Sequence, residues 1–547
     1  MSCEPPRLRS HWRLVAASMA GVVAEAVLLW ALGLRASIAV APQVSAPAPF
    51  GVFHDLRWLL VFTRSWMSFA WATVVMLAVR SALTASFVRL AWPHGVPAPK
   101  WRASLVGAAV FTVVATVLLS PWAALLFGMA VTPVSWLFFT AVPTTLFIAL
   151  LIHPGAVTSG WWREVPPLRT AGWTLLTFLV LTLDGAALSV SPTYLYVPVA
   201  VAAGLFNGWA WLGLVHAIVC REKAPRVVPL APIGVVLLLA MVAGGVDLGF
   251  AVVTAREHLH KFARGARSAG QPVVVVAGFG SFWNGDTTPA LNGHFDERRY
   301  SYRGMDAGGQ PLSYGRSDTH RPLGDLVRAM AVQVDALHQA TGAPVSIVAE
   351  SEGALVAKVY AVTTPRPPIG ALILLSPLVD PARVYFPRRG REGFGLAAAA
   401  ELRGIAGILA TLSPVNVSTD TPLFRSIVDN APTVRQLLRC PVPGVRQLAL
   451  FPLADAVVAP HPSDIGSRSA VVPAFHGGLL SNPSVKLTIA LELSSRRAPG
   501  VHTWARVERT IEVSAAAWQV PELPIRLNSA WRAPSPSVGC GQLVLPG

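Results

Sequence analysis

Ser351 lies between small residues in a segment with the pattern of a chemically active turn. The pentapeptide Ala349-Glu350-Ser351-Glu352-Gly353 follows the run Val345-Ser346-Ile347-Val348 and precedes a helix-forming stretch that ends near Tyr360. A strand, a sharp turn and a helix in this order form a nucleophile elbow, which lifts a serine hydroxyl clear of its surroundings. The amides at the start of the helix favour negative charge there. The segment therefore predicts a serine nucleophile, although small residues often flank a serine by chance in a chain rich in alanine and glycine.

The segments around this serine alternate between strand-like and helix-like patterns. Strands are expected at residues 272–277, 298–304, 345–350, 369–375 and 447–453, and an amphipathic helix at 323–338. This alternation predicts a mainly parallel sheet with helices on both faces. The turn Gly278-Phe279-Gly280 follows the first strand, but Trp283 stands where a dinucleotide-binding fingerprint needs its third glycine.

Over about residues 270–495 the chain resembles the α/β-hydrolase superfamily of lipases and esterases. The resemblance is carried by the order of a strand, the glycine turn, Tyr300-Ser301-Tyr302-Arg303-Gly304, a helix, the serine turn, an insertion, Asp455 and His476. Those enzymes place a catalytic triad in the chain order Ser, Asp or Glu, His. The resemblance implies that Ser351 is the nucleophile, His476 the general base, and Asp455 the group that orients the imidazole. Asp380 and His461 remain alternatives for the acid and the base.

The resemblance also implies an oxyanion hole, made of backbone amides that face the negative oxygen of the intermediate. The matching amides here belong to Glu352 and Phe279, with Gly280 as the alternative to Phe279. Glu350 and Glu352 flank the serine, and a carboxylate in that place opposes a developing anion unless its side chain points away.

An insertion at about residues 380–443 is expected to form a helical cap over the pocket. Residues 392–412 and 423–438 have helical patterns. An apolar cap suits acyl chains, and a basic one suits anionic lipid headgroups. The basic residues of this insertion are Arg383, Arg388, Arg389 and Arg391.

The first half of the chain is too apolar for a soluble domain. Of the whole chain, 53% is hydrophobic and only 13% charged, and 14 of the 18 tryptophans precede residue 212, as interfacial aromatic belts require. Seven segments have about the length of a membrane-spanning helix. They cover residues 12–34, 58–80, 103–125, 131–152, 171–191, 194–219 and 229–253, and either Ser120-Pro121-Trp122 or Thr132-Pro133 could separate the third from the fourth. The prediction is a multi-span bundle at 1–254 followed by an α/β-hydrolase-like domain at 255–547.

The arginines and lysines between these segments predict the orientation. They precede the first span and follow the second, fourth and sixth, whereas the loops after the third and fifth have none. The positive-inside rule then places the N-terminus in the cytoplasm and, with seven spans, the domain at 255–547 on the extracytoplasmic side. An error of one span would reverse this. The first segment is interpreted as a retained span, because its apolar core is long for a signal peptide.

Four ionisable residues fall within the predicted spans: Glu25, Asp184, His216 and Asp247. Such groups are costly in lipid, so they pair inside the bundle, serve a proton or substrate path, or mark misplaced span ends. Arg64 is a candidate partner. No internal repeat indicates a transporter.

The remaining composition excludes some classes of function. The net charge of +16 comes without a basic, aromatic-interleaved groove, which argues against nucleic-acid binding. No metal-binding motif occurs, and no cofactor is expected. Cys440 and Cys540 are either bridged or free in an extracytoplasmic domain, while Cys3 and Cys220, at the inner face, are expected to stay reduced.

The sequence thus predicts an integral membrane serine hydrolase that cleaves carboxylic esters, with lipid or cell-envelope esters favoured. Acyl transfer to an envelope acceptor and the cleavage of thioesters or peptides are the alternatives within this chemistry. The alternative from another class is a membrane carrier or sensor with an inactive hydrolase-like domain. The expected partners are the ester or lipid substrate and membrane lipids, and the sequence does not indicate an oligomeric state.

Overall fold

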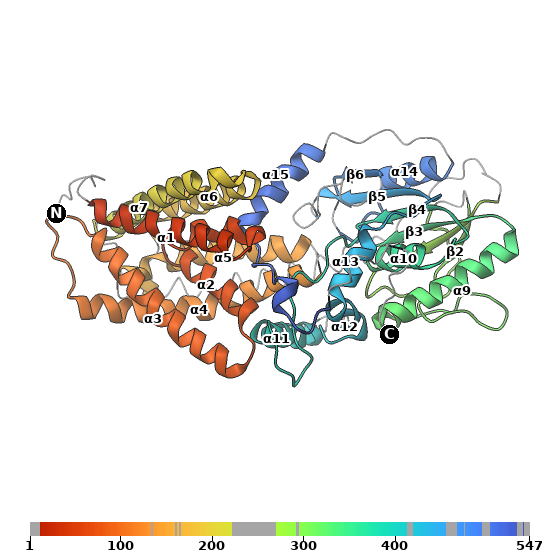
Figure 1. Ribbon diagram of the computed structural model, residues 1–547, viewed down its shortest axis with the longest axis horizontal. Coiled ribbons are helices and arrows are strands. Elements are labelled where there is room, and N and C mark those ends of the chain that lie inside the picture. Colours follow the sequence, from red (N-terminus) through yellow and green to blue (C-terminus); the bar gives the residue numbers. More distant parts are fainter. Residues whose placement is uncertain are drawn as a thin grey trace.

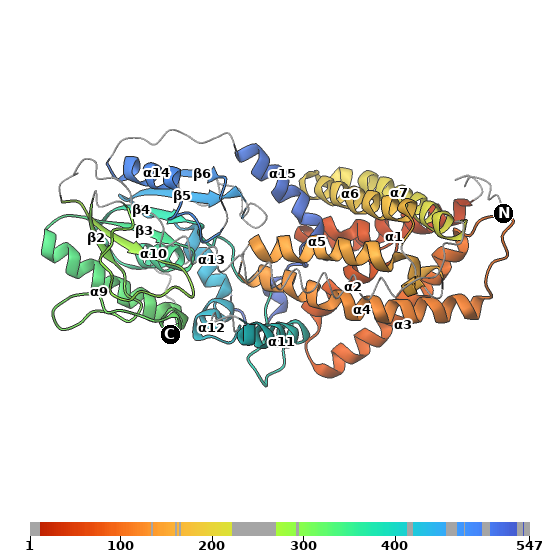
Figure 2. The same cartoon turned by 180° about the vertical axis from the view of Figure 1, so that it is seen from behind.

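The computed structural model comprises a helical bundle and a sheet domain, which lie side by side along the long axis of the molecule (Figures 1 and 2). The residues described are 11–132, 135–158, 161–163, 166–220, 270–291, 295–412, 419–453, 455, 468–474, 476–494, 504–532 and 540. The predicted seventh span at 229–253 and the predicted domain boundary near residue 254 lie outside these residues.

Seven α-helices form the bundle in the described part of the chain. They are α1 (Trp12–Ala31), α2 (Phe50–Phe62), α3 (Trp66–Leu90), α4 (Trp101–Val131), α5 (Ser135–Ile152), α6 (Leu168–Val190) and α7 (Tyr196–Val219), with the 3₁₀ helix η2 (Arg35–Gln43) between α1 and α2. Apart from α2, these helices match six segments that are long and apolar enough to cross a membrane. The first half of the chain therefore has the build of an integral membrane domain.

The predicted second span, 58–80, is wrong in its position. The helix breaks at Thr63 and restarts at Trp66, because Ser65 caps α3: the Ser68 amide donates to Ser65 Oγ at 3.1 Å, and the Ser65 amide donates to Ser68 Oγ at 2.9 Å. The 13 residues of α2 are too few to cross a bilayer, and most of its side chains are buried inside the bundle. The polar residues between α2 and α3 are few and both helices are apolar, so the sequence does not indicate where one helix ends and the next begins. In contrast, α4 continues through Pro121, which excludes the turn at Ser120-Pro121-Trp122.

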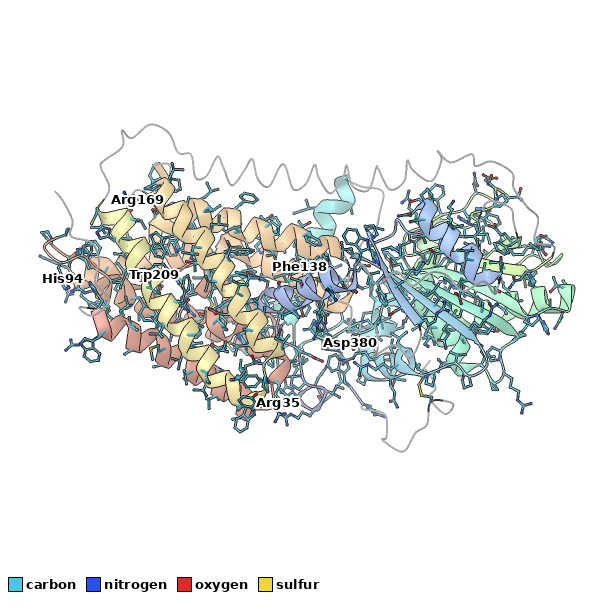
Figure 3. The ribbon with its side chains drawn as sticks, turned by 90° about the horizontal axis from the view of Figure 1, so that it is seen from above. Arg35, His94, Phe138, Arg169, Trp209 and Asp380 are labelled. Carbon is cyan, nitrogen blue, oxygen red and sulfur yellow. A yellow bond between two sulfur atoms is a disulfide. The ribbon has the colours of Figure 1, made fainter. Side chains whose placement is uncertain are left out.

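The two ends of the bundle differ in their neighbours. His94 and Arg169 lie at the end far from the sheet domain, whereas Arg35 and Phe138 lie nearer to it (Figure 3). His11, just before α1, forms a hydrogen bond through Nδ1 with the Leu90 carbonyl at the end of α3, at 2.8 Å. The start of α1 and the end of α3 therefore lie at the same end of the bundle. Exposed aromatic side chains occur at the ends of the spans, as membrane interfaces favour. They include Trp12, Trp30, Trp66, Trp101 and Tyr194.

In the described residues the sheet domain has six strands, all of them parallel, and the alternating pattern had predicted a mainly parallel sheet. They are β1 (Pro272–Val276), β2 (Asp296–Arg299), β3 (Val345–Glu350), β4 (Ile369–Leu375), β5 (Arg446–Pro452) and β6 (Arg468–Val472), in the spatial order β2-β1-β3-β4-β5-β6. Successive residues point to opposite faces: Val274 and Val276 pack on one side, and Val273 and Val275 on the other. Helices α9 (Leu323–Thr341), α10 (Glu352–Thr363) and α13 (Ala431–Arg439) cover the first face, and α14 (Pro483–Leu493) covers the second.

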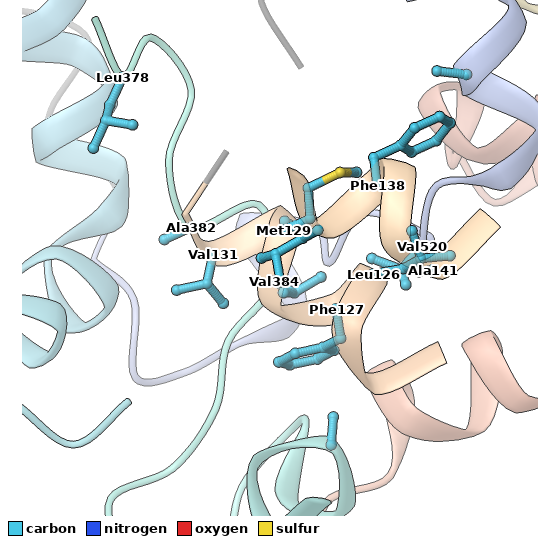
Figure 4. Close-up of a cluster of buried hydrophobic side chains, with 14 of the residues drawn as sticks. Leu126, Phe127, Met129, Val131, Phe138, Ala141, Leu378, Ala382, Val384 and Val520 are labelled. Carbon is cyan, nitrogen blue, oxygen red and sulfur yellow. The ribbon is translucent and has the colours of Figure 1, made fainter. Parts of the chain in front are cut away.

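The insertion after β4 joins the two domains as well as adding helices near the sheet. Within a few residues of β4, the Ala382 amide donates to the Val131 carbonyl and the Arg383 amide to the Ala130 carbonyl of α4, each at 2.8 Å. Leu126, Met129, Val384 and Val520 pack together at this joint (Figure 4). The carboxyl end of the sheet therefore faces the bundle. The helices of the insertion are α11 (Leu396–Leu412), α12 (Pro422–Asp429) and α13. Of these, α11 packs on α4 of the bundle.

The residues after α15 (Ala505–Ala515) return to the bundle, for which the sequence offered no motif. We call residues 516–531 the strap. Trp518 in the strap is 1% exposed, and its ring stacks on Phe178 of α6 with centroids 4.5 Å apart. Arg57 of α2 donates to the carbonyls of Ala517 at 3.0 Å and Gln519 at 2.7 Å. The blue C-terminal segment accordingly lies among the red and orange helices in Figure 1.

Two cysteines of the sheet-domain half are bridged. Cys440, which follows α13, is bonded to Cys540. Cys220 is disulfide-bonded too, so the expectation that it stays reduced is wrong. That expectation came from the predicted side of the membrane, and distance along a sequence carries no information on which thiols meet.

Candidate active site

The sheet brings the predicted site residues to one edge. All strands are parallel, so the segments that follow β1, β3, β5 and β6 leave from the same side. The chain passes from β1 outward to β2 and later from β3 outward in the opposite direction, which makes β1 and β3 the topological switch point of the sheet. Ligands of open parallel sheets bind beside such a point. Gly278 follows β1 and Ser351 follows β3, so the two turns flank this position.

Ser351 occupies the strained turn that its sequence context predicts. Its φ is +54° and its ψ is −115°, in a region that residues other than glycine rarely adopt. The Ser351 amide donates to the Leu375 carbonyl of β4 at 2.8 Å, which fixes the turn to the neighbouring strand. Its side chain makes no capping bond to α10. The hydroxyl is therefore available for another partner.

That partner is His476, in the segment after β6. His476 Nε2 lies 2.7 Å from Ser351 Oγ, and His476 Nδ1 lies 2.6 Å from Asp455 Oδ2. Asp455 is 6% exposed, which protects its charge from solvent. The structure thus brings together three predicted residues that are up to 125 positions apart. A serine hydroxyl, an imidazole and a carboxylate in this order can move a proton off the serine.

Asp380, the alternative acid from the sequence, does not enter this relay. Asp380 lies 3.3 Å from Arg439 and 4.0 Å from Arg435 through its Oδ1, so it belongs to an ion-pair cluster with α13. His461 lies outside the described residues. The acid in contact with the imidazole is Asp455.

Charge around His476 adjusts its basicity. Burial by itself lowers the pKa of the imidazole, but the Asp455 charge and hydrogen bond, with the charge of Glu350, outweigh it and leave the pKa raised above 6.5. The imidazole is thereby made a stronger base while it stays in contact with the serine hydroxyl.

Two backbone amides are free to face an oxyanion beside Ser351. Among the described groups, the amides of Phe279 and Glu352 have no acceptor, whereas the Gly280 amide donates to Thr319 Oγ1 at 3.0 Å. This bond removes Gly280 as the alternative to Phe279. A Cβ on Gly278 would lie 3.0 Å from Ser351 Cβ, so the β1 turn passes directly against the serine. The Glu352 amide opens α10, where unpaired N–H groups are normal.

The two glutamates beside the serine have different environments. Glu352 is 2% exposed and neither carboxyl oxygen has a hydrogen-bond partner among the described residues. Burial raises the pKa of this carboxyl well above its usual range and so favours its neutral form, which does not oppose an oxyanion. Glu350 Oε1 accepts from the Leu479 amide at 3.0 Å and so fixes the segment that carries His476.

Sequence interpretation missed the groups that position the β1 turn. Tyr302, fully buried after β2, donates from its hydroxyl to the Ala277 carbonyl at 2.6 Å, and Arg321 donates to the Tyr302 carbonyl at 2.9 Å. The Tyr-Ser-Tyr pattern pointed to Tyr302 as part of a strand exit but not to this bond. Nothing in the sequence pointed to Thr319.

Aromatic rings line the side of the β1 turn. The Phe279 ring stacks on His320 with centroids 4.7 Å apart and an interplanar angle of 15°, and it contacts Phe424 of α12 at 5.0 Å. An insertion helix thus lies next to the predicted oxyanion loop. Arg388 is joined to the other end of the same helix by an ion pair with Asp429 at 3.0 Å.

Where the structure describes them, the ionisable residues predicted within the spans belong to the bundle helices α1, α6 and α7. Glu25 pairs with His54 at 2.7 Å rather than with Arg64, whose guanidinium lies over the Phe394 ring. Asp184 Oδ2 is buried without a partner in the described part of the chain. Asp247 lies outside that part. No group of His, Cys, Asp and Glu among the described residues is arranged to hold a metal ion.

Comparison with known proteins adds little to this geometry. No protein-family model matches the chain, and no curated protein matches it. Among solved structures, the chain is similar to an esterase (EaEST) from Exiguobacterium antarcticum, with 18% sequence identity over 41% of this chain and 92% of that one and a TM-score of 0.25. A TM-score this low leaves the function to be inferred from the site itself.

Proposed function

We propose that this protein is a membrane-anchored serine hydrolase that cleaves carboxylic esters through an acyl-enzyme on Ser351. The observation that carries the proposal is the continuous relay from Ser351 Oγ to His476 Nε2 at 2.7 Å and from His476 Nδ1 to Asp455 Oδ2 at 2.6 Å. A carrier with an inactive hydrolase-like domain has no need for this alignment, so the geometry favours the enzyme.

In the first half of the reaction, Ser351 Oγ attacks the ester carbonyl carbon while His476 Nε2 accepts the hydroxyl proton. The carbonyl oxygen becomes an oxyanion and receives hydrogen bonds from the amides of Phe279 and Glu352. The His476 imidazolium then donates its proton to the leaving alcohol. Asp455 stabilises the imidazolium and keeps its ring oriented.

In the second half, water replaces the alcohol. His476 takes a proton from the water, the hydroxide attacks the acyl carbon, and the acid leaves as Ser351 regains its proton. Burial raises the pKa of the Glu352 carboxyl, and in its neutral form this side chain adds no charge that opposes the oxyanion bound by its own amide.

The fold we propose is of the α/β-hydrolase type, with the residues at about 380–443 as its insertion. The parallel order β2-β1-β3-β4-β5-β6, with a serine turn after β3, an acid after β5 and a histidine after β6, supports this proposal. The chain order of the three residues agrees with it as well.

Lipid or cell-envelope esters are the proposed substrates, on the extracytoplasmic side. The sheet edge that carries Ser351 faces the bundle, because the segment after the adjacent β4 bonds to the end of α4. An ester in the membrane around the bundle would therefore lie close to this edge of the sheet. The proposed side follows from the loop charges and from a seventh span at 229–253.

The test uses the full-length protein in detergent or lipid nanodiscs. Wild type should label with a fluorophosphonate probe and hydrolyse short-chain esters, and Ser351→Ala should abolish labelling and lower kcat by about ten-thousandfold or more. Ser376→Ala is the matched control: Ser376 also ends a strand of the sheet with a positive φ, and its hydroxyl has no partner among the described residues. Hydrolysis that survives Ser351→Ala would reject the serine assignment.

The same preparation separates hydrolysis from acyl transfer. Products are analysed with and without an added acceptor alcohol. Free acid as the main product under both conditions supports the hydrolase, whereas a new ester in place of the acid shows that the acyl-enzyme is made for an acceptor other than water.

A further inference from the structure

A chain of charged side chains crosses the interior of the helical bundle. His54 on α2 is 3% exposed, and its two ring nitrogens contact two carboxyl groups. Nε2 lies 2.7 Å from Glu25 Oε1 on α1, and Nδ1 lies 2.9 Å from Asp55 Oδ1. Arg80 on α3 donates from Nε to Asp55 Oδ2 at 2.7 Å and from Nη2 to Asp55 Oδ1 at 2.5 Å. Three helices are therefore linked through the adjacent residues His54 and Asp55.

These contacts require one proton more than the ordinary charge states supply. A neutral imidazole donates from one nitrogen and accepts at the other, while an ionised carboxylate only accepts. Two carboxylates can therefore not both bond a neutral ring. An extra proton must lie on the ring or on a carboxyl group. Asp55 is held as the anion by the two donors of Arg80, so the extra proton is shared between Glu25 and His54.

A third contact indicates where the proton lies. Trp58 Nε1 lies 3.2 Å from His54 Nε2, and an indole nitrogen is only a donor. This contact favours His54 Nε2 as an acceptor whose one lone pair is shared by the Trp58 N–H and a protonated Glu25 carboxyl group, with the Nδ1 proton directed to Asp55. Moving the proton breaks the O–H bond of Glu25 and forms the Nε2–H bond of His54, which leaves a carboxylate and an imidazolium.

The charges around this pair suit both protonation states. Among the described residues, the charged groups that face His54 and its partners are Glu25 from α1, Asp55 and Arg57 from α2, and Arg80 from α3. Gln43 from η2 contributes an amide, which Arg57 binds, and the strap contributes the carbonyls described above. Without the extra proton, two carboxylates face two guanidinium groups and the charges balance. With it, one positive charge is in excess.

We propose that Glu25 and His54 form a proton-binding site inside the bundle, where one proton is taken up and released. The chemistry is separate from ester hydrolysis and gives the membrane domain a function of its own. Ionisable groups inside a membrane bundle are costly to keep and indicate function by default, and here a buried histidine has a carboxyl group at each ring nitrogen.

The test is infrared difference spectroscopy of the full-length protein in nanodiscs as the pH is raised, in H₂O and D₂O. Wild type should lose a carbonyl band of a protonated carboxyl group, and Glu25→Gln should lack that band at every pH. Asp184→Asn is the matched control, because Asp184 is a partly buried acid on α6 outside this chain of contacts. It should keep the band that Glu25→Gln loses.

Two results would overturn the proposal: a wild type with no titrating carboxyl band, or a Glu25→Gln spectrum that retains every band of wild type. If Glu25→Gln does not fold, His54→Gln makes the same test. It leaves Glu25 without the base that shares its proton, so the pH at which the band disappears must shift. An unchanged midpoint rejects the shared proton. Neither readout depends on Ser351.

Discussion

At the scale of single residues, the candidate site depends on how His476 is charged. A general base must be neutral to accept the proton of Ser351, and the carboxylates of Asp455 and Glu350 keep the pKa of this imidazole above 6.5. As the pH falls through this raised pKa, the imidazole becomes charged and the reaction stops. The acidic limb of kcat/KM should therefore lie above the ordinary pKa of histidine.

Glu350→Gln should move that limb to lower pH. The amide keeps an acceptor for the Leu479 N–H but removes a negative charge that raises the pKa of His476. The pKa of the base then falls, and activity persists to a more acidic pH. The rate of ester hydrolysis measured across pH gives the position of this limb. Glu492→Gln is the control, because Glu492 pairs with Arg468 at the start of β6, at the edge of the sheet opposite Ser351. A limb that does not move would show that Glu350 has no electrostatic role.

The sequence was informative about these residues to a limited depth. Ser351, Asp455 and His476 could be named because their order along the chain resembles a known pattern. Two features could not be predicted: the hydrogen bond from the Gly280 amide to Thr319, and the burial of the Glu352 carboxyl group without a hydrogen-bond partner among the described residues. Both depend on how loops distant in sequence pack, which no local pattern encodes.

At the scale of elements, the site depends on the close approach of β1 and α10. A Cβ on Gly353, in the first turn of α10, would lie 2.7 Å from the Ala277 carbonyl oxygen and 2.7 Å from Val276 Cγ1. Only glycine leaves the helix near enough for the Phe279 amide to face the serine. The distance between the two turns therefore depends on Gly353, which has no side chain.

Gly353→Ala should push the β1 turn away from Ser351. We expect a loss of about 1–3 kcal/mol of stability from overpacking and a larger effect on kcat/KM, since the Phe279 amide moves with the turn. Thermal unfolding and ester hydrolysis measure the two effects. Gly404→Ala in α11 is the control: a Cβ there meets nothing within 4 Å, so it should keep activity and gain about 0.5–1 kcal/mol. Full activity in Gly353→Ala would contradict the argument.

The elements were the best predicted part of the protein. Five of the strands and most helices were visible from their apolar periods, because a buried strand or an amphipathic helix carries its pattern locally. The break between α2 and α3 was missed since both helices are apolar, and only the Ser65–Ser68 cap separates them. The strand β6 was not predicted either.

At the scale of the whole molecule, the strap decides how the two domains are held. Trp518 inserts between α2 and α6, its Nε1 donates to Thr182 Oγ1 at 2.8 Å, and Arg383 donates to Gln519 Oε1 at 2.6 Å. One short segment therefore contacts the bundle and the segment after β4 together. For this reason the proposed activity should be tested on the full chain.

Trp518→Ala should weaken this joint. Removing a fully buried tryptophan costs about 3–5 kcal/mol, and the loss should appear as a lower Tm and faster proteolysis of the full-length protein. Trp504→Ala is the control, because Trp504 is 36% exposed and its loss should change stability by about 0.5 kcal/mol or less. Equal Tm values for the two variants would mean that Trp518 of the strap does not stabilise the protein.

The strap also sets a condition on biosynthesis. Arg57 is synthesised within about the first tenth of the chain, yet two of its hydrogen-bond acceptors, the carbonyls of Ala517 and Gln519, are synthesised near the end. Until then a guanidinium group remains only partly satisfied inside nascent helices. The insertion machinery must therefore retain these helices, or shield them, until synthesis is almost complete.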